Sequence, residues 1–414
     1  MVVVFMMLNW ADKSALGLTA VPIMDGLGLR PEQFGLLGSA YFFLYAVSTI
    51  AFGWVATRIG VNRIMGALVL VWAVALLPVV FAATFAVLLT SRIVLGAGEA
   101  PATPLGNFMA HSWFPDRRRT VAGTLVMIGS PLGVLVAGPG LTSVMLAFGW
   151  RAIYGVLAVL GLVWAAAWWL VGREGPHAGR ATGAEGSRPV RPLAALRVIG
   201  RNPAWIGCTV AGFGAYWATT LSTTWLPAYF TKGLGFDASA TGALVALTPA
   251  ISIAVMLVWA AVSAGLLRRG VTTRWARAGL LGLTMVTGGA CIVIGVSAAT
   301  TGTTVVLVSI GLALSQPVYP LVFLLLSEVS PESLRAFAIS FSAALFTFAG
   351  ILAPWLTGRL VGAAAGASGY VSAFTVCGAV MAAGGLVALL IKPSTPRDVL
   401  LAGDLPVGPE TVRP

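Results

Sequence analysis

Long apolar runs occur along nearly the whole of this 414-residue chain, and they constrain its fold more than any other feature. A helix that crosses a bilayer needs about 20 consecutive, mostly apolar residues. Twelve such runs occur, with approximate bounds of 2–24, 33–56, 63–84, 87–110, 119–146, 151–172, 204–230, 239–266, 276–298, 303–326, 335–362 and 368–391. The sequence therefore predicts an all-α membrane protein with twelve transmembrane helices.

The scarcity of charge supports the same conclusion. Only 9% of the residues are charged, whereas a soluble domain has roughly 25%. A surface so poor in charge faces lipid more readily than water. The net charge of +12 would favour a nucleic-acid partner in a soluble protein. In a membrane protein, the positions of the charges matter more than their sum.

Two polar segments divide the chain. Residues 173–203 are rich in Gly, Pro, Arg and Ser and predict a cytoplasmic linker. Residues 393–414 include five prolines and predict a disordered cytoplasmic tail. The expected domains are therefore two six-helix bundles, at 1–172 and 204–392.

The basic residues follow the predicted topology. If the N-terminus is cytoplasmic, nineteen of the 25 Lys and Arg residues fall in inside loops, the linker or the tail. Three fall in outside loops, namely Arg30, Arg151 and Lys232. Such a bias is typical of a multi-pass protein of the cell membrane with both termini inside. The topology explains the basic excess, so no nucleic-acid partner is needed, and we expect a monomer.

The two predicted bundles share a loop pattern. Residues 115–122 read Pro-Asp-Arg-Arg-Arg-Thr-Val-Ala, and residues 331–338 read Pro-Glu-Ser-Leu-Arg-Ala-Phe-Ala. Both have Pro, an acid, two residues, Arg, two residues and Ala, at matching places in the two halves. The match indicates an internal duplication, and parallel repeats of this kind place a binding site near the midplane.

Four charges lie well inside the predicted spans, away from their ends, where a central charge costs about 2.5–3.5 kcal/mol. Asp12 and Lys13 lie midway along the first span, and Arg92 and Glu99 lie in the fourth. Neighbours on a helix point about 100° apart, so Asp12 and Lys13 do not share one face. Arg92 and Glu99 share a face about 10 Å apart along the axis. Each charge is therefore expected to meet a neighbouring helix.

These charges allow two interpretations. In one, they line a binding cavity in which the carboxylates accept protons and the cations hold an anionic solute. In the other, they form a structural ion-pair network between the first and fourth spans. We favour the first, because charged residues within membrane spans usually mark a functional site.

Other polar residues give weaker signals. Tyr216, Trp217, Gln316 and Tyr319 lie deep in apolar spans and are candidates for contact with a solute. Packing between helices with a satisfied hydrogen bond explains each of them equally well. Glu328 lies near Arg335 at the cytoplasmic end of the tenth span, which favours an ion pair at a gate.

Motifs of enzymes and metal sites do not occur in the sequence. HExxH, CxxC, GxSxG and a phosphate-binding loop are all missing. We therefore expect no enzyme activity, no catalytic residues, no metal and no cofactor.

The duplicated twelve-helix plan resembles the major facilitator superfamily. Residues 53–63 read Gly-Trp-Val-Ala-Thr-Arg-Ile-Gly-Val-Asn-Arg, which is similar to that family's loop between spans 2 and 3. The family pattern has Asp where this chain has Thr57. The resemblance implies a cytoplasmic gate at Arg58 and Arg63, with Asp116 as an acid that could serve them.

Within that superfamily, the chain is most similar to the anion:cation symporters. The similarity rests on Asn-Trp-Ala-Asp-Lys at 9–13, the run from Arg92 to Pro101, and Trp-Phe-Pro at 113–115. It implies that Asp12 and Glu99 take up protons.

The same resemblance implies a substrate site at Lys13, Arg92 and Tyr45. Lys13 stands where many members have Arg. Ser130 stands where sugar-acid carriers have Gln, which argues against a polyhydroxylated sugar acid.

We therefore expect a proton-coupled symporter that moves a small organic anion, with a carboxylate as the expected class, by alternating access. The alternative is a proton-driven exporter of a hydrophobic or drug-like compound on the same fold. A membrane receptor is disfavoured, because neither the linker nor the tail is long enough for a signalling domain.

Overall fold

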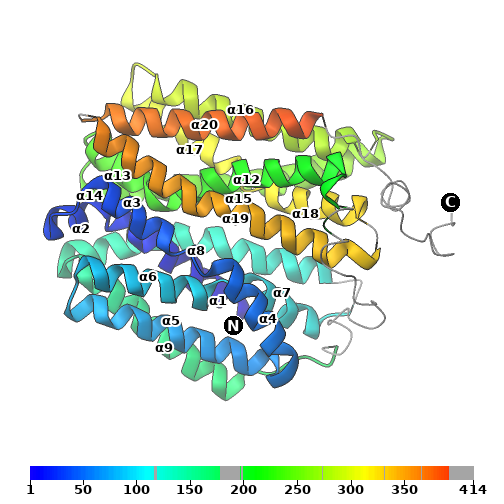
Figure 1. The fold of residues 1–414 in the computed structure, drawn as a ribbon, viewed down its shortest axis with the longest axis horizontal. Coiled ribbons are helices and arrows are strands. Elements are labelled where there is room, and N and C mark those ends of the chain that lie inside the picture. The colour runs from blue at the N-terminus through cyan, green and yellow to red at the C-terminus, as the bar shows by residue number, and fades with distance from the viewer. Residues whose placement is uncertain are drawn as a thin grey trace. The chain divides into compact units, whose positions relative to one another are not determined.

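A computed structural model of the chain describes residues 1–115, 119–177, 196, 199–272, 274–330, 332–364 and 366–390. This part of the chain forms helices joined by short turns, without a strand (Figure 1). Ten of its helices are long and apolar enough to cross a membrane. The predicted all-α membrane fold is confirmed, whereas the predicted tail and most of the predicted linker lie outside the described residues.

The first sequence half forms nine helices within the described residues. Their bounds are α1 (Val2–Leu18), α2 (Ala20–Leu27), α3 (Pro31–Ala40), α4 (Tyr45–Ile59), α5 (Val61–Phe81), α6 (Phe85–Glu99), α7 (Ala102–Trp113), α8 (Arg119–Phe148) and α9 (Trp150–Val171). The predicted spans 63–84, 119–146 and 151–172 correspond to α5, α8 and α9. The spans at 2–24, 33–56 and 87–110 each consist of two helices separated by a short interruption.

The second half has the same character. Its elements are α12 (Pro203–Thr224), α13 (Leu226–Ala228), the π-helical turn η2 (Tyr229–Gly233), α14 (Ala238–Val245), α15 (Leu247–Arg268), the π-helical turn η3 (Arg274–Gly279), α16 (Leu280–Val296), α17 (Thr301–Ala313), α18 (Val318–Val329), α19 (Glu332–Ala363) and α20 (Ser368–Leu389). The predicted first and seventh spans are not among the ten helices that are long and apolar enough to cross a membrane. Both are nevertheless helical: the first forms α1 and α2, and the seventh forms α12, α13 and η2.

The interruptions have local causes in the sequence. Pro101 separates α6 from α7, and Pro317 precedes α18; proline cannot donate the backbone hydrogen bond that a continuous helix requires. Gly28 ends α2 with a φ of 61°, a left-handed conformation that glycine adopts without steric cost. Thr19 interrupts the first span between α1 and α2, with φ −93° and ψ 6°.

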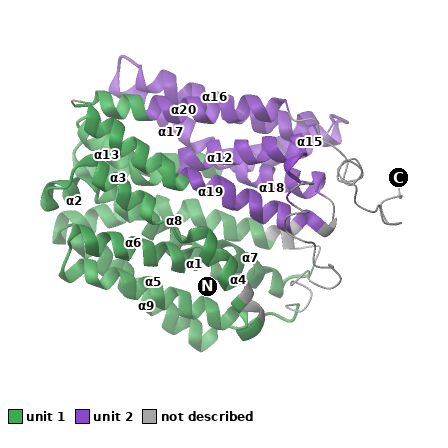
Figure 2. Ribbon diagram, viewed as in Figure 1, with its two compact units in different colours: residues 1–183, 220–253, 350–373 green, residues 184–219, 254–349, 374–414 purple. Residues whose placement is uncertain are grey.

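The described residues group into two compact units (Figure 2). Unit 1 contains residues 1–183, 220–253 and 350–373, and unit 2 contains 184–219, 254–349 and 374–414. Unit 1 thus includes the first-half helices, all of α13, η2 and α14, and parts of α12, α15, α19 and α20. The predicted domain boundaries at 172 and 204 remain a prediction.

Close helix packing in unit 1 brings α1, α6 and their neighbours together. A side chain on Gly133 of α8 would collide with the backbone of Met7 in α1. A side chain on Gly96 of α6 would collide with the Tyr41 carbonyl group, just after α3. Small residues permit such close approach between membrane helices, and here they bring the charged residues of α1 and α6 close to the end of α3.

Candidate functional site

The four charges predicted within the membrane spans all lie in unit 1. Asp12 and Lys13 lie on α1, and Arg92 and Glu99 lie on α6. Asp12, Arg92 and Glu99 are at most 3% exposed, and Asp12 is close enough to the other three for their charges to interact. We call these four residues the charge cluster. The structure therefore brings together the residues that the sequence singled out.

Glu99 has hydrogen-bond donors from two other segments. The Tyr41 hydroxyl group donates to Glu99 Oε2 at 2.6 Å, and Asn9 Nδ2 donates to the same oxygen at 3.1 Å. The other carboxylate oxygen, Oε1, is buried and has no hydrogen-bond partner within the described part of the chain. One side of the carboxylate is thus held in place while the other stays available to a proton or another donor.

Asp12 also has a carboxylate oxygen without a hydrogen-bond partner in the described part of the chain. It is 3% exposed, and its Oδ1 atom is buried without a hydrogen-bond partner among the described residues. A buried carboxylate that lacks donors is costly in its ionised form. Two acids of the cluster thus have an oxygen at which a proton can bind.

Lys13 is surrounded by an amide and two aromatic rings. Its Nζ atom donates to Asn9 Oδ1 at 2.8 Å. The same atom lies 4.8 Å from the ring centre of Trp10 and 5.9 Å from that of Tyr41, so both rings stabilise the ammonium group through their π faces. Asn9 therefore bridges Lys13 and Glu99, with its carbonyl oxygen toward the cation and its amide nitrogen toward the carboxylate.

Arg92 contacts a tyrosine of α9. Its Nη2 atom donates to the Tyr154 hydroxyl oxygen at 3.4 Å, and its Cζ atom lies 5.9 Å from the centre of that ring. No carboxylate oxygen of the described residues lies within 4.0 Å of Arg92 or Lys13. The alternative prediction is a structural ion-pair network. Within the described residues, these four charges form no ion pair at salt-bridge distance.

Two further predicted site residues also lie in unit 1. Tyr45 is half-buried at the start of α4, and its ring centre is 5.9 Å from that of Tyr41. Ser130 is buried on α8, the helix that packs on α1. Tyr41, and not Tyr45, provides the hydrogen bond to Glu99.

The four weaker candidates lie in unit 2, and two of them contact Thr219. Gln316 Nε2 donates to the Thr219 hydroxyl oxygen at 3.1 Å, and the Tyr319 hydroxyl lies 2.8 Å from it. The ring of Tyr216 packs edge-on against that of Tyr319, with centres 6.2 Å apart. Trp217 is 6% exposed, and its indole N–H has no partner among the described residues.

The predicted gate residues have different surroundings. Arg58 and Arg63 are exposed at the end of α4 and the start of α5, and Asp116 lies outside the described residues. Glu328 of α18 forms an ion pair with Arg277 of η3, not with Arg335, which is exposed. The predicted acid is thus in an ion pair, but its partner comes from the turn before α16.

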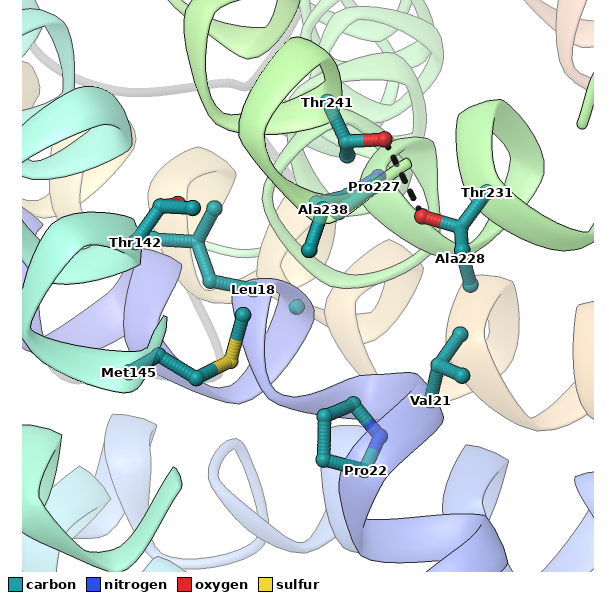
Figure 3. A pocket seen from close by; sticks show the side chains of 11 residues that line it. Leu18, Val21, Pro22, Thr142, Met145, Pro227, Ala228, Thr231, Ala238 and Thr241 are labelled. Carbon is teal, nitrogen blue, oxygen red and sulfur yellow. Dashed lines mark hydrogen bonds between the residues drawn. The ribbon is translucent and has the colours of Figure 1, made fainter. Parts of the chain in front are cut away.

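A small cavity of about 90 Å³ lies at the C-terminal end of α1 in unit 1 (Figure 3). Its lining is largely apolar and contains no ionisable side chain. Thr142, Thr231 and Thr241 supply its hydroxyl groups, and the last two lie 3.1 Å apart. An anion would find no charge there, so the charge cluster is the better candidate for a solute site.

Comparison with known proteins identifies the family. The family model described as Major Facilitator Superfamily matches residues 2–354. The chain belongs to this superfamily. Membership confirms the prediction of a membrane transporter and not an enzyme.

Sequence similarity to named transporters supports this assignment. This superfamily member is 32% identical over 170 residues to the hexuronate transporter of Bacillus subtilis (strain 168), over 41% of this chain and 40% of that one. It is 27% identical over 273 residues to the probable L-galactonate transporter of Escherichia coli (strain K12), over 64% of this chain and 60% of that one. The matched stretches therefore span about half the length of these relatives.

Solved structures show the same fold. The inward-facing, unoccupied structure of a bacterial homolog to the human lysosomal transporter Spinster has a TM-score of 0.76 and 18% identity. The alignment covers 97% of this superfamily member and 96% of that chain. At such low identity, the likeness supports the fold alone.

Sequence reasoning missed several residues of the site. Tyr41, Tyr154 and Thr219 were not singled out, although each is a buried polar residue within a predicted apolar span. That signal is the one that selected Tyr216 and Tyr319. Asn9 appeared only as part of a motif, and its spacing of four from Lys13 places both on one helix face.

Proposed function

We propose that the chain is a proton-coupled symporter of a small organic anion, with a carboxylate as the expected class. One observation carries the proposal: two cations lie in the membrane-embedded part of unit 1 without a carboxylate within 4.0 Å among the described residues. A cation held away from water without a direct ion-pair partner is costly. An anionic solute would supply that partner.

Arg92 supplies the geometry for such an anion. A guanidinium group presents paired N–H donors that match the two oxygens of a carboxylate. Only one side-chain hydrogen bond of Arg92 occurs within the described residues, to Tyr154. Lys13, a point charge, would add attraction without much directionality.

The two acids provide a place for protons. With both acids ionised and both cations charged, the cluster is neutral, so adding a monoanion alone would leave a negative charge in the membrane. Protonation of Glu99 or Asp12 would restore neutrality, which lowers the cost of moving the loaded site through a low-dielectric region. Proton and anion are therefore expected to bind together.

The related transporters support the chemical class. Hexuronate and L-galactonate, the solutes in the names of two relatives, are both carboxylates. Ser130 in place of the Gln of sugar-acid carriers favours a smaller, less hydroxylated acid for this chain. Export of a hydrophobic compound fits less well, because such a compound would leave Lys13 and Arg92 without a direct ion-pair partner among the described residues.

Topology completes the proposal. The Lys and Arg bias favours a cell-membrane protein with both termini in the cytoplasm, so the proton gradient would drive the anion inward. A cysteine introduced at position 180, in a variant whose three native cysteines are replaced, can be labelled in intact and in permeabilised cells. This labelling would test on which side of the membrane the linker lies.

Transport in proteoliposomes tests the function. Wild-type protein should accumulate a radiolabelled carboxylate from a panel of small acids when the lumen is alkaline. Glu99→Gln should still exchange that acid across the membrane but lose proton-driven accumulation, because the proton site is gone. Arg92→Ala should lose both, whereas Arg359→Ala, which removes an exposed Arg of the same unit, should lose neither.

Two outcomes would contradict this function. Absence of uptake for every small acid in wild-type vesicles would reject an anion substrate. Normal proton-driven accumulation by Glu99→Gln would reject the coupling role of Glu99.

A further inference from the structure

Tyr154 is a fully buried residue of α9 that contacts the charge cluster from outside the sequence motifs. It is 1% exposed, and its ring packs edge-on against Trp150 with centres 6.1 Å apart. A buried tyrosine needs partners for its hydroxyl group. Here the two partners are Arg92, a member of the charge cluster, and Thr19, which follows α1.

The direction of the hydrogen bonds follows from the chemistry of the donors. Arg92 has no acceptor atom, so its Nη2 donates to the Tyr154 oxygen at 3.4 Å. The Thr19 hydroxyl donates to the Ala15 carbonyl oxygen at 2.7 Å. The Thr19 oxygen therefore accepts from the Tyr154 hydroxyl, 2.9 Å away.

These bonds form one oriented chain from α6 to α1. It runs from the Arg92 guanidinium through Tyr154 and Thr19 to the Ala15 carbonyl of α1. Thr19 marks the interruption between α1 and α2. The chain therefore joins the cation of α6 to the C-terminal turn of the helix that bears Asp12 and Lys13.

We propose that Tyr154 is a positioning residue that orients Arg92 for the anion and ties it to the interruption of the first span at Thr19. The inference rests on the proposed function. A guanidinium already held at one nitrogen and over one ring face loses less freedom on binding, and such preorganisation improves affinity. The N–H groups of Arg92 that do not bond to Tyr154 would then be available to an oxyanion.

Conservative variants separate positioning from packing. Tyr154→Phe keeps the ring against Trp150 and Arg92 but removes the hydroxyl group. We expect its KM for the transported acid to rise about tenfold, the usual worth of a hydrogen bond to a charged group, with kcat near the wild-type value. Tyr370→Phe, at a buried tyrosine of unit 1 that stacks on Tyr229, is the control and should leave both constants unchanged.

Variants of Thr19 test the same proposal independently. Thr19→Ser keeps the hydroxyl group and should retain the wild-type KM, whereas Thr19→Val should raise KM in the same direction as Tyr154→Phe. In an Arg92→Lys background, Tyr154→Phe should add less than it does alone, because the two residues act through each other.

Three results would overturn the inference while wild-type vesicles transport the acid. They are an unchanged KM in Tyr154→Phe, an equal KM for Thr19→Ser and Thr19→Val, or full additivity with Arg92→Lys. Absence of transport in wild-type vesicles would instead count against the proposed function.

Discussion

The Tyr41 hydroxyl group donates a hydrogen bond of 2.6 Å to Glu99 Oε2, across two helices and 58 positions of sequence. This bond and the one from Asn9 hold the carboxylate on one side. The relationship links the end of α3 to the proposed proton site, and it makes Tyr41 as important to test as Glu99 itself.

Tyr41→Phe should shift the pH dependence of uptake to higher pH. The ionised carboxylate loses its shortest hydrogen bond and therefore takes up a proton more readily. Initial uptake rates over a pH series in proteoliposomes measure the shift. Tyr370→Phe, at a buried tyrosine of the same unit that stacks on Tyr229, is the control; a shift of equal size in both variants would contradict the prediction.

Lys13→Ala should abolish the thermal stabilisation that the transported acid gives to the purified protein. The reason is loss of a partly buried cation held by Asn9, Trp10 and Tyr41. Lys232→Ala removes the same charge from an exposed pair with Asp25 at 3.0 Å. That variant should keep the stabilisation and lose only about 0–1 kcal/mol of folding free energy. Retained stabilisation in Lys13→Ala would show that Lys13 does not hold the anion.

Gly358→Ala should lower the midpoint of thermal unfolding and slow transport. A Cβ there would lie 2.5 Å from the Pro31 carbonyl oxygen and 3.1 Å from the Gly35 Cα atom. Both are backbone atoms, so α3 and α19 would have to separate within unit 1, at a cost of about 1–3 kcal/mol. Gly140→Ala, where a Cβ would meet nothing within 4 Å, is the matched control. Equal midpoints in the two variants would argue against this close approach.

The ion pair between Arg277 and Glu328 should tolerate exchange of its two charges. Arg277→Glu and Glu328→Arg each place two like charges together and should each reduce uptake strongly. The double variant restores opposite charges and should recover much of the activity, as a double-mutant cycle would measure. Arg335→Ala should have little effect, because Arg335 is exposed and Glu328 is paired elsewhere. Failure of the double variant to recover uptake would contradict this prediction.

The sequence by itself determined where helices form and which of them contain charge. Runs of about 20 apolar residues leave few alternatives in a membrane, because an unpaired backbone group in lipid costs several kcal/mol. The same property made Asp12, Lys13, Arg92 and Glu99 conspicuous. The prediction that each charge meets a neighbouring helix is confirmed for Glu99, through Asn9 and Tyr41, and for Arg92, through Tyr154.

Only the tertiary structure decided which side chains meet. The helical period fixes the face on which a residue lies, but not the neighbour that this face contacts or the height at which two helices pack. Tyr41 and Tyr45 are four residues apart on the same segment, yet the 2.6 Å bond to Glu99 comes from Tyr41. Glu328 likewise pairs with Arg277 and not with the nearer Arg335 in sequence. Glycine contacts such as that of Gly96 with Tyr41 set these heights, and no pattern within one helix encodes them.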